Sequence, residues 1–408
     1  MHVLIIAQYF PPDMGGGATR AYNIAKGLVL NGCKVTVITA APHYPHGNIP
    51  RKYRWKPLVV EYKEKMRIIR TLMPPISSIG LLNRVILFTS FMISSLFALF
   101  IVRKVDVIWA ANPNILSFFP ALIYSLVKKS PVVLNADDLW PEDLYNLGLI
   151  KKESIIFRLG EILARIAYHK SEAITPISPG YTKVITKKYK VKTSKIHVVR
   201  AGVDITKFKP MKYQRRNDKF IIVYSGAFSL AYDFDQILEA AKILQKKDKQ
   251  ILFVIQGGGE QADRIKMKTR KLRLKNVIII DSILTREKVA QLLNIADVLI
   301  LPLRDFGRPY LGISSKLYEY QAVGKPIICV AKGQPAEYIK ETNSGIVVAP
   351  GDYKSLAEAI LYLKENRDIA EKLGKNGRKY IENNMSISKI GLRMREIFES
   401  ILIRSRRG

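Results

Sequence analysis

One stretch of the chain reads Ser314-Ser315-Lys316-Leu317-Tyr318-Glu319-Tyr320-Gln321-Ala322-Val323-Gly324-Lys325-Pro326. The serine pair predicts the start of a helix, because a serine hydroxyl can cap the free amides of a first turn. Gly324 and Pro326 predict its end, since glycine adopts the left-handed stop and proline cannot continue a helix. The apolar run 327–330 predicts a buried strand, so the stretch forms one helix-and-strand unit of an α/β sheet.

Lys316 and Glu319 give this helix an unusual charge pattern. Lys316 would lie in the first turn, where the helix dipole already disfavours a cation. An anion bound between Lys316 and the free amides would remove the conflict. Glu319, one turn later on the same face, could accept hydrogen bonds from two vicinal hydroxyls. A phosphate beside a diol describes a nucleotide; the alternative is a surface ion pair between Lys316 and Glu319.

The composition limits the classes of protein and partner. The chain has 408 residues, which predicts two domains. It has 66 Lys and Arg against 34 Asp and Glu, a net charge of +32, which predicts an anionic partner: nucleic acid, a membrane surface or a phosphorylated substrate. Cys33 and Cys329 are too far apart for a disulfide framework or zinc spacing, and the chain begins with a strand instead of a basic leader. We therefore expect a cytoplasmic location.

A strand, a glycine loop, a helix and a second strand follow one another twice. The first copy consists of strand 2–8, loop 15–17, helix 18–30 and strand 34–39. The second copy begins with strand 220–224, and its loops contain Ser225-Gly226 and Gly257-Gly258-Gly259. Glycines allow a backbone to approach a ligand closely. The repeat predicts two doubly wound α/β domains with a nucleotide site in the cleft between them.

Several other segments complete this pattern. We expect further strands at 105–110, 131–134, 173–176 and 195–199, and a linker over 201–210. The first glycine loop is not a dinucleotide fingerprint, because Arg20 stands at the position of its last glycine. Asp233 and Asp235 resemble a metal-binding pair, but a helix start favours acids and explains them better.

Asp137 and Asp138 follow strand 131–134 directly. Open α/β sheets place ligands at the carboxyl ends of their strands, which predicts a binding or catalytic role for this pair. The alternative is that one of them caps a helix whose first turn contains Pro141.

The segment 85–102 contains no charged residue and follows a basic region, 51–70, that also contains Tyr53 and Trp55. Three interpretations stay open: a helix that dips into lipid headgroups, a buried core helix, or a membrane span. The basic flanks favour the first, a peripheral contact with an anionic membrane surface. We accordingly expect residues 51–104 to associate with a membrane.

Five motifs together resemble a known family. They are Gln8-Tyr9-Phe10-Pro11-Pro12, His43-Tyr44-Pro45-His46-Gly47, Asp138-Leu139-Trp140-Pro141-Glu142, Gly202-Val203-Asp204 with Phe208-Lys209-Pro210, and Ser315-Lys316-Leu317-Tyr318-Glu319-Tyr320. In order and spacing the chain resembles the retaining glycosyltransferases of family 4, and is most similar to bacterial members that add an amino sugar in O-antigen or capsule synthesis.

The resemblance implies the GT-B fold, in which two Rossmann-like domains face each other across a cleft. Residues 1–203 would form the acceptor-binding domain and residues 204–383 the nucleotide-sugar-binding domain. Residues 384–408 would form a helix that returns to the N-terminal domain.

The resemblance also implies site residues. Lys316 would bind the donor diphosphate, Glu319 the ribose hydroxyls, and Ser282 and Ile283 the base. Asp137 or Asp138 would orient the sugar or acceptor and, with Lys316, make up the catalytic set. The complete donor-binding set would be Gly16, Gly17, Ser225, Gly226, Gly257, Gly258, Ser282, Ile283, Arg304, Ser314, Ser315, Lys316, Leu317 and Glu319.

Three positions depart from the family pattern. Leu311 stands where an acidic residue usually contacts the sugar, which leaves the sugar undefined. No basic residue follows Ser225-Gly226 at 227–229, so the phosphate charge would depend more on Lys316, with Arg304 or Arg308 as helpers. Asp137 takes the place of a histidine that is common in the wider family.

The expected reaction is transfer of a sugar, with retention, from a UDP-sugar to an undecaprenyl-diphosphate-linked saccharide. We expect no metal or other cofactor, because Lys316 and a helix dipole would stabilise the departing diphosphate. The alternatives are a UDP-sugar 2-epimerase, which needs no acceptor, a basic nucleic-acid-binding protein, and a membrane scaffold. No nucleic-acid-binding module is recognisable, so nucleic acid is not an expected partner.

Overall fold

The computed structural model describes residues 1–44, 46–78, 80–112, 115–146, 148, 150–211 and 218–407. Pro45 of the second motif lies outside the described residues. The chain forms two compact units. Unit 1 consists of Met1–Gly202 and Ile387–Gly408, and unit 2 consists of Val203–Ser386.

Unit 1 is built on a seven-stranded sheet with the order β3-β4-β2-β1-β5-β6-β7. Its strands are β1 (His2–Ile6), β2 (Lys34–Ala40), β3 (Leu58–Lys63), β4 (Met66–Thr71), β5 (Val107–Asn112), β6 (Val132–Ala136) and β7 (Ala173–Pro176). The described pairings are parallel except the β3–β4 hairpin at one edge. β1 and β6 are almost wholly buried, as apolar strands covered on both faces should be.

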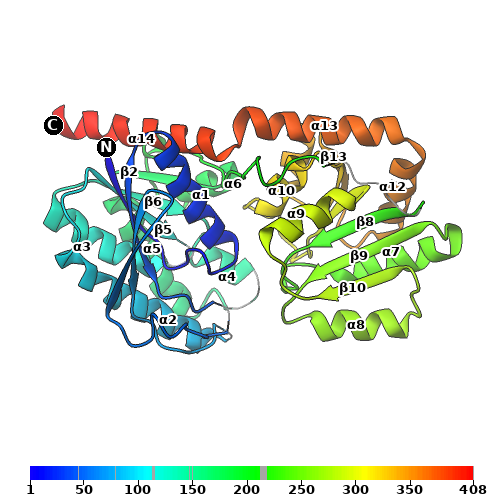
Figure 1. Ribbon diagram of the computed structural model, residues 1–408, viewed down its shortest axis with the longest axis horizontal. Helices are drawn as coiled ribbons and strands as arrows, with labels where there is room; N and C mark the ends of the chain where they lie inside the picture. Colours follow the sequence, from blue (N-terminus) through cyan, green and yellow to red (C-terminus); the bar gives the residue numbers. More distant parts are fainter. Residues whose placement is uncertain are drawn as a thin grey trace. The chain divides into compact units, whose positions relative to one another are not determined.

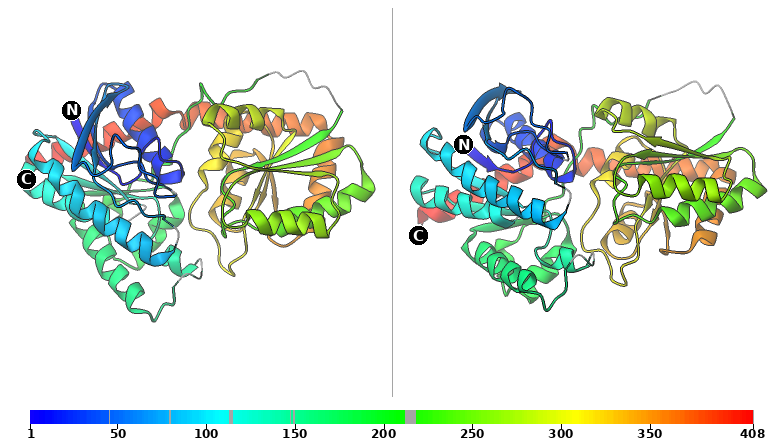
Figure 2. Two further views of the ribbon diagram at one scale, coloured as in Figure 1. Left: turned by 60° about the horizontal axis from the view of Figure 1, so that its bottom comes forward. Right: turned by 90° about the horizontal axis from the view of Figure 1, so that it is seen from below.

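Helices cover both faces of this sheet (Figure 1). α1 (Gly16–Leu30) packs against α14 (Ile387–Arg407), so the C-terminal helix belongs to unit 1. α2 (Leu81–Ser94) continues as the 3-10 helix η1 (Ser95–Phe100), and both lie beside α3 (Phe118–Lys128), which in turn contacts α5 (Ile155–Lys170) (Figure 2). The remaining helical segments are η2 (Ile115–Ser117), α4 (Glu142–Asn146), α6 (Pro179–Lys187) and η3 (Thr193–Lys195).

Unit 2 is a six-stranded parallel sheet with the order β10-β9-β8-β11-β12-β13. Its strands are β8 (Phe220–Ser225), β9 (Ile251–Gly257), β10 (Val277–Asp281), β11 (Val298–Pro302), β12 (Ile327–Val330) and β13 (Gly345–Val348). Its helices are α7 (Phe234–Lys247), α8 (Ala262–Lys271), α9 (Arg286–Ile295), α10 (Ser315–Ala322), α11 (Gln334–Thr342), α12 (Tyr353–Glu365) and α13 (Arg367–Asn384).

Each sheet contains a point at which the strand order reverses direction. In unit 2 the chain proceeds from β8 through β9 to one edge, and from β11 through β12 to the other, so β8 and β11 are neighbours at the reversal. The corresponding neighbours in unit 1 are β1 and β5. Loops leaving the carboxyl ends of such neighbours diverge and form a crevice for ligands.

Two secondary-structure predictions need correction. Residues 195–199 do not form a regular strand: Ile196 alone bridges to Ile174, and the Val199 carbonyl is bound by Arg20 instead of a strand partner. The basic region 51–70 contains the β3–β4 hairpin, which the sequence did not indicate. β3 is a half-exposed edge strand, and its charged residues gave it the composition of a loop.

Two helical glycines allow α1 and α14 to touch. A Cβ on Gly391 would lie 2.1 Å from the Gly27 carbonyl carbon, and one on Gly27 would lie 2.4 Å from the Ile387 carbonyl oxygen. We expect Gly391→Ala to destabilise unit 1 by about 1–3 kcal/mol through overpacking, although alanine is the better helix former. Urea unfolding followed by tryptophan fluorescence measures this, because Trp55, Trp109 and Trp140 all lie in unit 1.

Ser388→Ala, an exposed change on the same helix, is the control. A Gly391→Ala protein at least as stable as this control would mean that the two helices do not rely on the close contact.

Candidate functional site

The first group of site residues lies at the strand reversal of unit 2. Ser225 ends β8, and Gly226 opens the loop that leads to α7. The neighbouring strand β11 leads to α10, which begins at Ser315. Gly324 has φ +71°, so the predicted left-handed end of this helix is confirmed. The sequence stretch that predicted an anion site therefore lies where the topology opens a crevice.

Gly226 and Gly257 bring two backbones and the Lys316 side chain together. A Cβ on Gly257 (φ +157°) would lie 1.8 Å from the Gly226 carbonyl oxygen. A Cβ on Gly226 (φ +150°) would lie 1.9 Å from Lys316 Cε. At Gly257 both the space and the backbone conformation require glycine, whereas at Gly226 the backbone conformation does and a Cβ would displace the Lys316 side chain. The Lys316 side chain thus crosses the backbone at Gly226.

The Lys316 ammonium contacts the side chain of Tyr232. Its Nζ donates a hydrogen bond to Tyr232 Oη at 2.9 Å and lies 4.7 Å from the ring centroid. Tyr232 is only 8% exposed. Burial alone would raise the pKa of this phenol, but the Lys316 ammonium and the Ser314 hydroxyl outweigh it and lower the pKa below its ordinary value.

The Glu319 carboxylate binds a different partner, Arg286. Glu319 is 9% exposed, and Arg286 Nη2 at the start of α9 donates to its Oε1 at 2.7 Å. The Arg286 guanidinium in turn lies over the Phe208 ring, 4.7 Å from its centroid. The alternative of a surface Lys316–Glu319 pair is therefore wrong, because each charge has its own partner on a separate element.

Hydrogen bonds connect the remaining loops. Ser225 Oγ donates to Gln256 Oε1, and Gln256 Nε2 donates to the Ser282 carbonyl, both at 2.6 Å. The Tyr320 hydroxyl bonds the backbone of Ser225. Because these bonds join the ends of β8, β9 and β10, the predicted residues Ser225, Gly258, Ser282 and Ile283 lie along neighbouring strand ends.

Four further predicted residues lie at the start of α10 or beside the loop that precedes α7. Ser314 is the N-cap residue of α10, but its side chain makes no capping bond among the described residues. Ser315 is the first residue of the helix. Leu317 is fully buried, and its amide donates to the Ser314 carbonyl. Arg304 donates to Gln261 Oε1 at 3.3 Å, so its guanidinium supports the loop.

The second group lies in unit 1, at the start of α1. Gly15 is the N-cap residue with φ +120°, and Gly16 and Gly17 form the first helical turn. A Cβ on Gly16 would meet no described atom within 4 Å, so the space beside this turn is open. The first turn contains no acidic residue. Its amides and the positive end of the dipole suit an anion.

The first two motifs also meet in unit 1. The Tyr9 ring stacks on His43 with 5.5 Å between centroids. Asp13 Oδ1 accepts bonds from the amides of His43 and Tyr44, each at 3.0 Å. Asp13 thus holds the loop after β2 against the loop after β1.

Asp137 and Asp138 have different environments. Asp137 is buried and pairs with Arg20, whose Nε lies 2.6 Å from Asp137 Oδ1. Arg20 Nη2 also donates to Asn135 Oδ1 and to the Val199 carbonyl, each at 2.7 Å. The position that breaks the dinucleotide fingerprint is thus occupied by a buried arginine that connects α1, β6 and the end of unit 1. Burial raises the pKa of Asp137, and Arg20 opposes this.

Asp138 is exposed, unlike its neighbour. The N-cap alternative for this pair is not supported, because α4 begins later, at Glu142. The prediction that Asp233 and Asp235 mark a helix start is confirmed: Asp233 is the N-cap residue of α7, and its Oδ1 accepts from the Asp235 amide. Over the described residues, no three His, Cys, Asp or Glu side chains are grouped to hold a metal.

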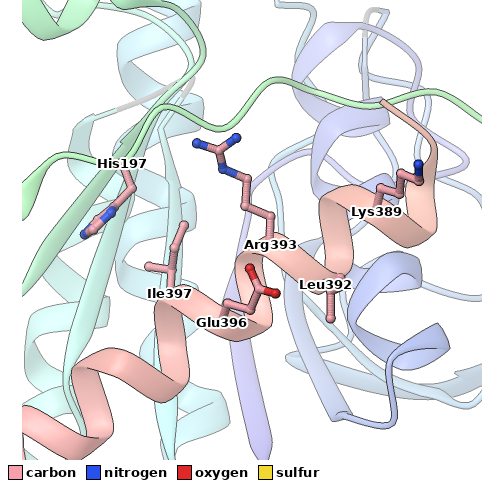
Figure 3. A pocket seen from close by; sticks show the side chains of 6 residues that line it. All are labelled: His197, Lys389, Leu392, Arg393, Glu396 and Ile397. Atoms are coloured by element: carbon pink, nitrogen blue, oxygen red, sulfur yellow. The ribbon is translucent and has the colours of Figure 1, made fainter. Parts of the chain in front are cut away.

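A separate hollow of about 510 Å³ lies in unit 1 beside α14 (Figure 3). Its described lining, His197, Lys389, Leu392, Arg393, Glu396 and Ile397, includes none of the predicted site residues. The functional interpretation therefore depends on the two strand-end groups.

Sequence reasoning missed Tyr232, Arg286, Gln256 and Arg20. Tyr232 and Arg286 lie 84 and 33 residues from their partners. The only sequence signal for Tyr232 was indirect: the loop after Ser225-Gly226 lacks the basic residue that the family pattern places there.

Comparison with known proteins gives consistent matches. Residues 14–207 match the model "Glycosyltransferase Family 4", and residues 206–380 match "Glycosyl transferases group 1". The chain is 23% identical over 202 residues to the capsular polysaccharide biosynthesis glycosyltransferase CapM of Staphylococcus aureus, covering 49% of this chain and 51% of that protein. The chain thus spans about half the length of this curated relative.

Two solved structures are similar over almost the whole chain. Sucrose-phosphate synthase from Thermosynechococcus elongatus has a TM-score of 0.77 at 18% identity, with 99% of each chain covered. Anabaena HepE, solved with UDP and glucose, has a TM-score of 0.68 at 16% identity, with 98% of this chain and 100% of that chain covered. At these identities the likeness shows the fold.

The two aspartates allow a direct test of the site description. Asp137→Ala leaves Arg20 without its carboxylate in a buried position, so we expect unit 1 to lose about 3 kcal/mol of stability. Asp138→Ala changes an exposed side chain, and we expect a loss below about 0.5 kcal/mol. Urea unfolding followed by tryptophan fluorescence compares the two. Equal stability of both variants would contradict the buried ion pair.

Proposed function

Because the chain belongs to the family 4 glycosyltransferases and has the GT-B fold, we propose that it transfers a sugar from a UDP-sugar to a lipid-linked saccharide. We propose retention of the anomeric configuration, an N-acetylated amino sugar as the group transferred, and an undecaprenyl-diphosphate-linked acceptor. The product would enter a bacterial surface polysaccharide such as O-antigen or capsule. The relative CapM, named for capsular polysaccharide biosynthesis, supports this assignment.

The arrangement of Lys316 and Glu319 on α10 is the observation that carries the proposal. Lys316, near the amide end of the helix, binds Tyr232, and Glu319, one turn later, binds Arg286. The ammonium and the carboxylate therefore do not pair with each other. The cation and the dipole suit a diphosphate, whose charge grows as the bond to the sugar breaks. The carboxylate suits ribose hydroxyls, and Arg286 fixes its orientation. The solved complex of HepE with UDP supports a nucleotide donor.

We propose that the reaction requires no metal, because Lys316 and the start of α10 supply the positive charge. Asp138, exposed at the end of β6, would orient the acceptor or the sugar. Asp137 would act through Arg20 by holding α1, whose glycine turn has the open space and free amides that suit an anion. In this proposal the leaving phosphate accepts the acceptor's proton.

The deciding experiment incubates the protein with a panel of UDP-sugars and short-chain polyprenyl-diphosphate saccharides, and identifies products by mass. A lengthened lipid-linked saccharide supports the proposal. An epimerised free nucleotide sugar, formed without acceptor, would identify a UDP-sugar 2-epimerase instead.

The prediction for Glu319 concerns the nucleotide alone. We expect Glu319→Ala to weaken UDP binding by about 1–3 kcal/mol, because hydrogen bonds to a carboxylate are lost. Isothermal titration calorimetry with UDP measures it. Glu337→Ala on α11, also in unit 2, is the control. Unchanged UDP affinity in Glu319→Ala would refute the ribose contact.

We further propose that unit 1 binds an anionic membrane surface, peripherally and on the cytoplasmic side. The segment Leu82–Phe100 is long and apolar enough to cross a membrane by composition, and a third of it is buried. Leu87 and Phe91 are fully buried, whereas Ile93 is 53% and Phe100 88% exposed. A fully buried core helix is therefore not what the structure shows.

The exposed apolar surface extends beyond the region expected from the sequence. It includes Leu126 and Val127 of α3 and, on α5, a stripe at helical spacing: Ile155, Ile156, Leu159, Ile162 and Ile166. Exposed cations flank it at Arg103, Lys104, Lys129, Lys151, Lys152, Arg158 and Arg165. An apolar face edged by cations suits an anionic leaflet.

Vesicle flotation tests the membrane proposal. We expect the protein to float with vesicles containing phosphatidylglycerol at low salt, and the double variant Phe100→Asp, Leu126→Asp to stay at the bottom of the gradient. Leu392→Asp, an exposed leucine of α14 outside this surface, is the matched control and should float. Flotation of the double variant equal to wild type would contradict the proposed surface.

A further inference from the structure

We propose that Tyr232 is a positioning residue of the donor site: it holds the Lys316 ammonium in place for the diphosphate, so that this lysine serves in place of the missing basic residue at 227–229. The inference rests on the proposed nucleotide-sugar function and adds a residue that the family resemblance did not indicate. Its basis is the hydrogen bond of 2.9 Å from Lys316 Nζ to Tyr232 Oη, together with the path of the lysine across Gly226.

The lysine needs such a partner because its side chain is long and flexible. A lysine in one rotamer loses about 2 kcal/mol of side-chain entropy, and repulsion from the helix dipole adds to this cost. Gly226 opens a path for the side chain, and Tyr232 binds its end. An ammonium has three N–H donors. One donated to Tyr232 fixes the group, and the others suit the oxygens of a diphosphate.

Tyr232 is itself held firmly. Its amide donates to the Ser229 carbonyl, and its carbonyl accepts from Gln261 Nε2 at 3.0 Å. Its ring packs edge-on against Tyr224, with 5.5 Å between centroids. The hydroxyl therefore has a defined position before any ligand arrives, as preorganisation of a binding group requires.

The expected helper, Arg304, supports the same loop. Its guanidinium donates to Gln261 Oε1, and Gln261 Nε2 holds the backbone of Ser229 and Tyr232. In this structure the arginine thus acts on the loop that presents Tyr232, and Lys316 supplies the charge at Gly226. This arrangement explains how the loop 225–233 can serve a diphosphate without a cation of its own.

The Tyr232–Lys316 contact also predicts a pH dependence. The charged and titratable groups that face the phenol are Lys316 and Tyr320 on α10, Tyr224 on β8 and Tyr310 in the loop after β11. The pKa values of the three neighbouring tyrosines are raised by burial and that of Tyr232 is lowered, so Tyr232 ionises first as pH rises. The phenolate would hold the ammonium more strongly and repel the diphosphate, so UDP affinity should fall.

The test compares UDP with uridine, which lacks the diphosphate. UDP affinity is measured by calorimetry and uridine affinity by saturation-transfer NMR, for wild type and Tyr232→Phe, each with and without Lys316→Met. Phenylalanine keeps the ring and removes only the hydroxyl. We expect Tyr232→Phe to weaken UDP about tenfold and to leave uridine within twofold. In the Lys316→Met background it should change neither ligand.

The pH series provides the second measurement. As pH rises from neutral towards the ordinary pKa of a tyrosine, we expect wild type to lose more UDP affinity than Tyr232→Phe, whereas uridine, which shares the ionisable base, should show no difference between them.

Three results would overturn the inference alone. The first is equal weakening of UDP and uridine, which indicates a merely structural role, and the second is a Tyr232→Phe effect on UDP that persists without Lys316. The third is undiminished UDP binding by Tyr232→Phe, which leaves the proposed function intact. A wild-type protein that binds neither UDP nor uridine would instead overturn the proposed function, and the inference with it.

Discussion

The site in unit 2 depends on the contact between the Gly226 and Gly257 backbones. A Cβ on Gly257 would lie 1.8 Å from the Gly226 carbonyl oxygen, so the loops after β8 and β9 approach more closely than any other residue type would allow. The same absence of a side chain at Gly226 gives Lys316 its path. A lysine that the helix dipole disfavours is thereby stabilised from outside its own helix, by the loop and by Tyr232. The Gly226–Gly257 contact therefore links the packing of the strand ends to the position of the Lys316 ammonium.

The sequence predicted the features of this site that are local. The start of α10, the left-handed Gly324 and the unusual positions of Lys316 and Glu319 all follow from capping, backbone conformation and helical spacing within 13 residues. The partners of the two charges could not be predicted, because they depend on strand order. Tyr232 meets Lys316 because β8 lies beside β11. Arg286 meets Glu319 because α9, which connects edge strand β10 to β11, packs against β8 in the middle of the sheet. Hydrophobic periodicity specifies strands but not their order.

The same distinction applies to unit 1. The buried strands were predicted from their apolar runs, but the β3–β4 hairpin was missed because an edge strand has only one neighbour and tolerates charged residues. Arg20 counted in the sequence only as a departure from a glycine fingerprint. In the structure it occupies the centre of a buried network with Asp137, Asn135 and the Val199 carbonyl. Arg20 gives two adjacent aspartates, which look equivalent in the sequence, different environments. Asp137 neutralises its buried guanidinium, and Asp138 faces solvent.

The helices α2, α3 and α5 must satisfy two environments at once. Leu87, Tyr124 and Phe157 supply the layer that packs inside unit 1, yet the outer faces of the same helices carry isoleucine, leucine and phenylalanine. A helix that covers a sheet in water normally has a polar outer face. The high hydropathy of Leu82–Phe100 therefore has two sources. Its inner face is apolar because it packs in the core, and its outer face is apolar although a helix exposed to water does not need to be. A membrane span would draw Leu87 and Phe91 out of the core, whereas contact with a bilayer surface uses the outer face and leaves the core intact.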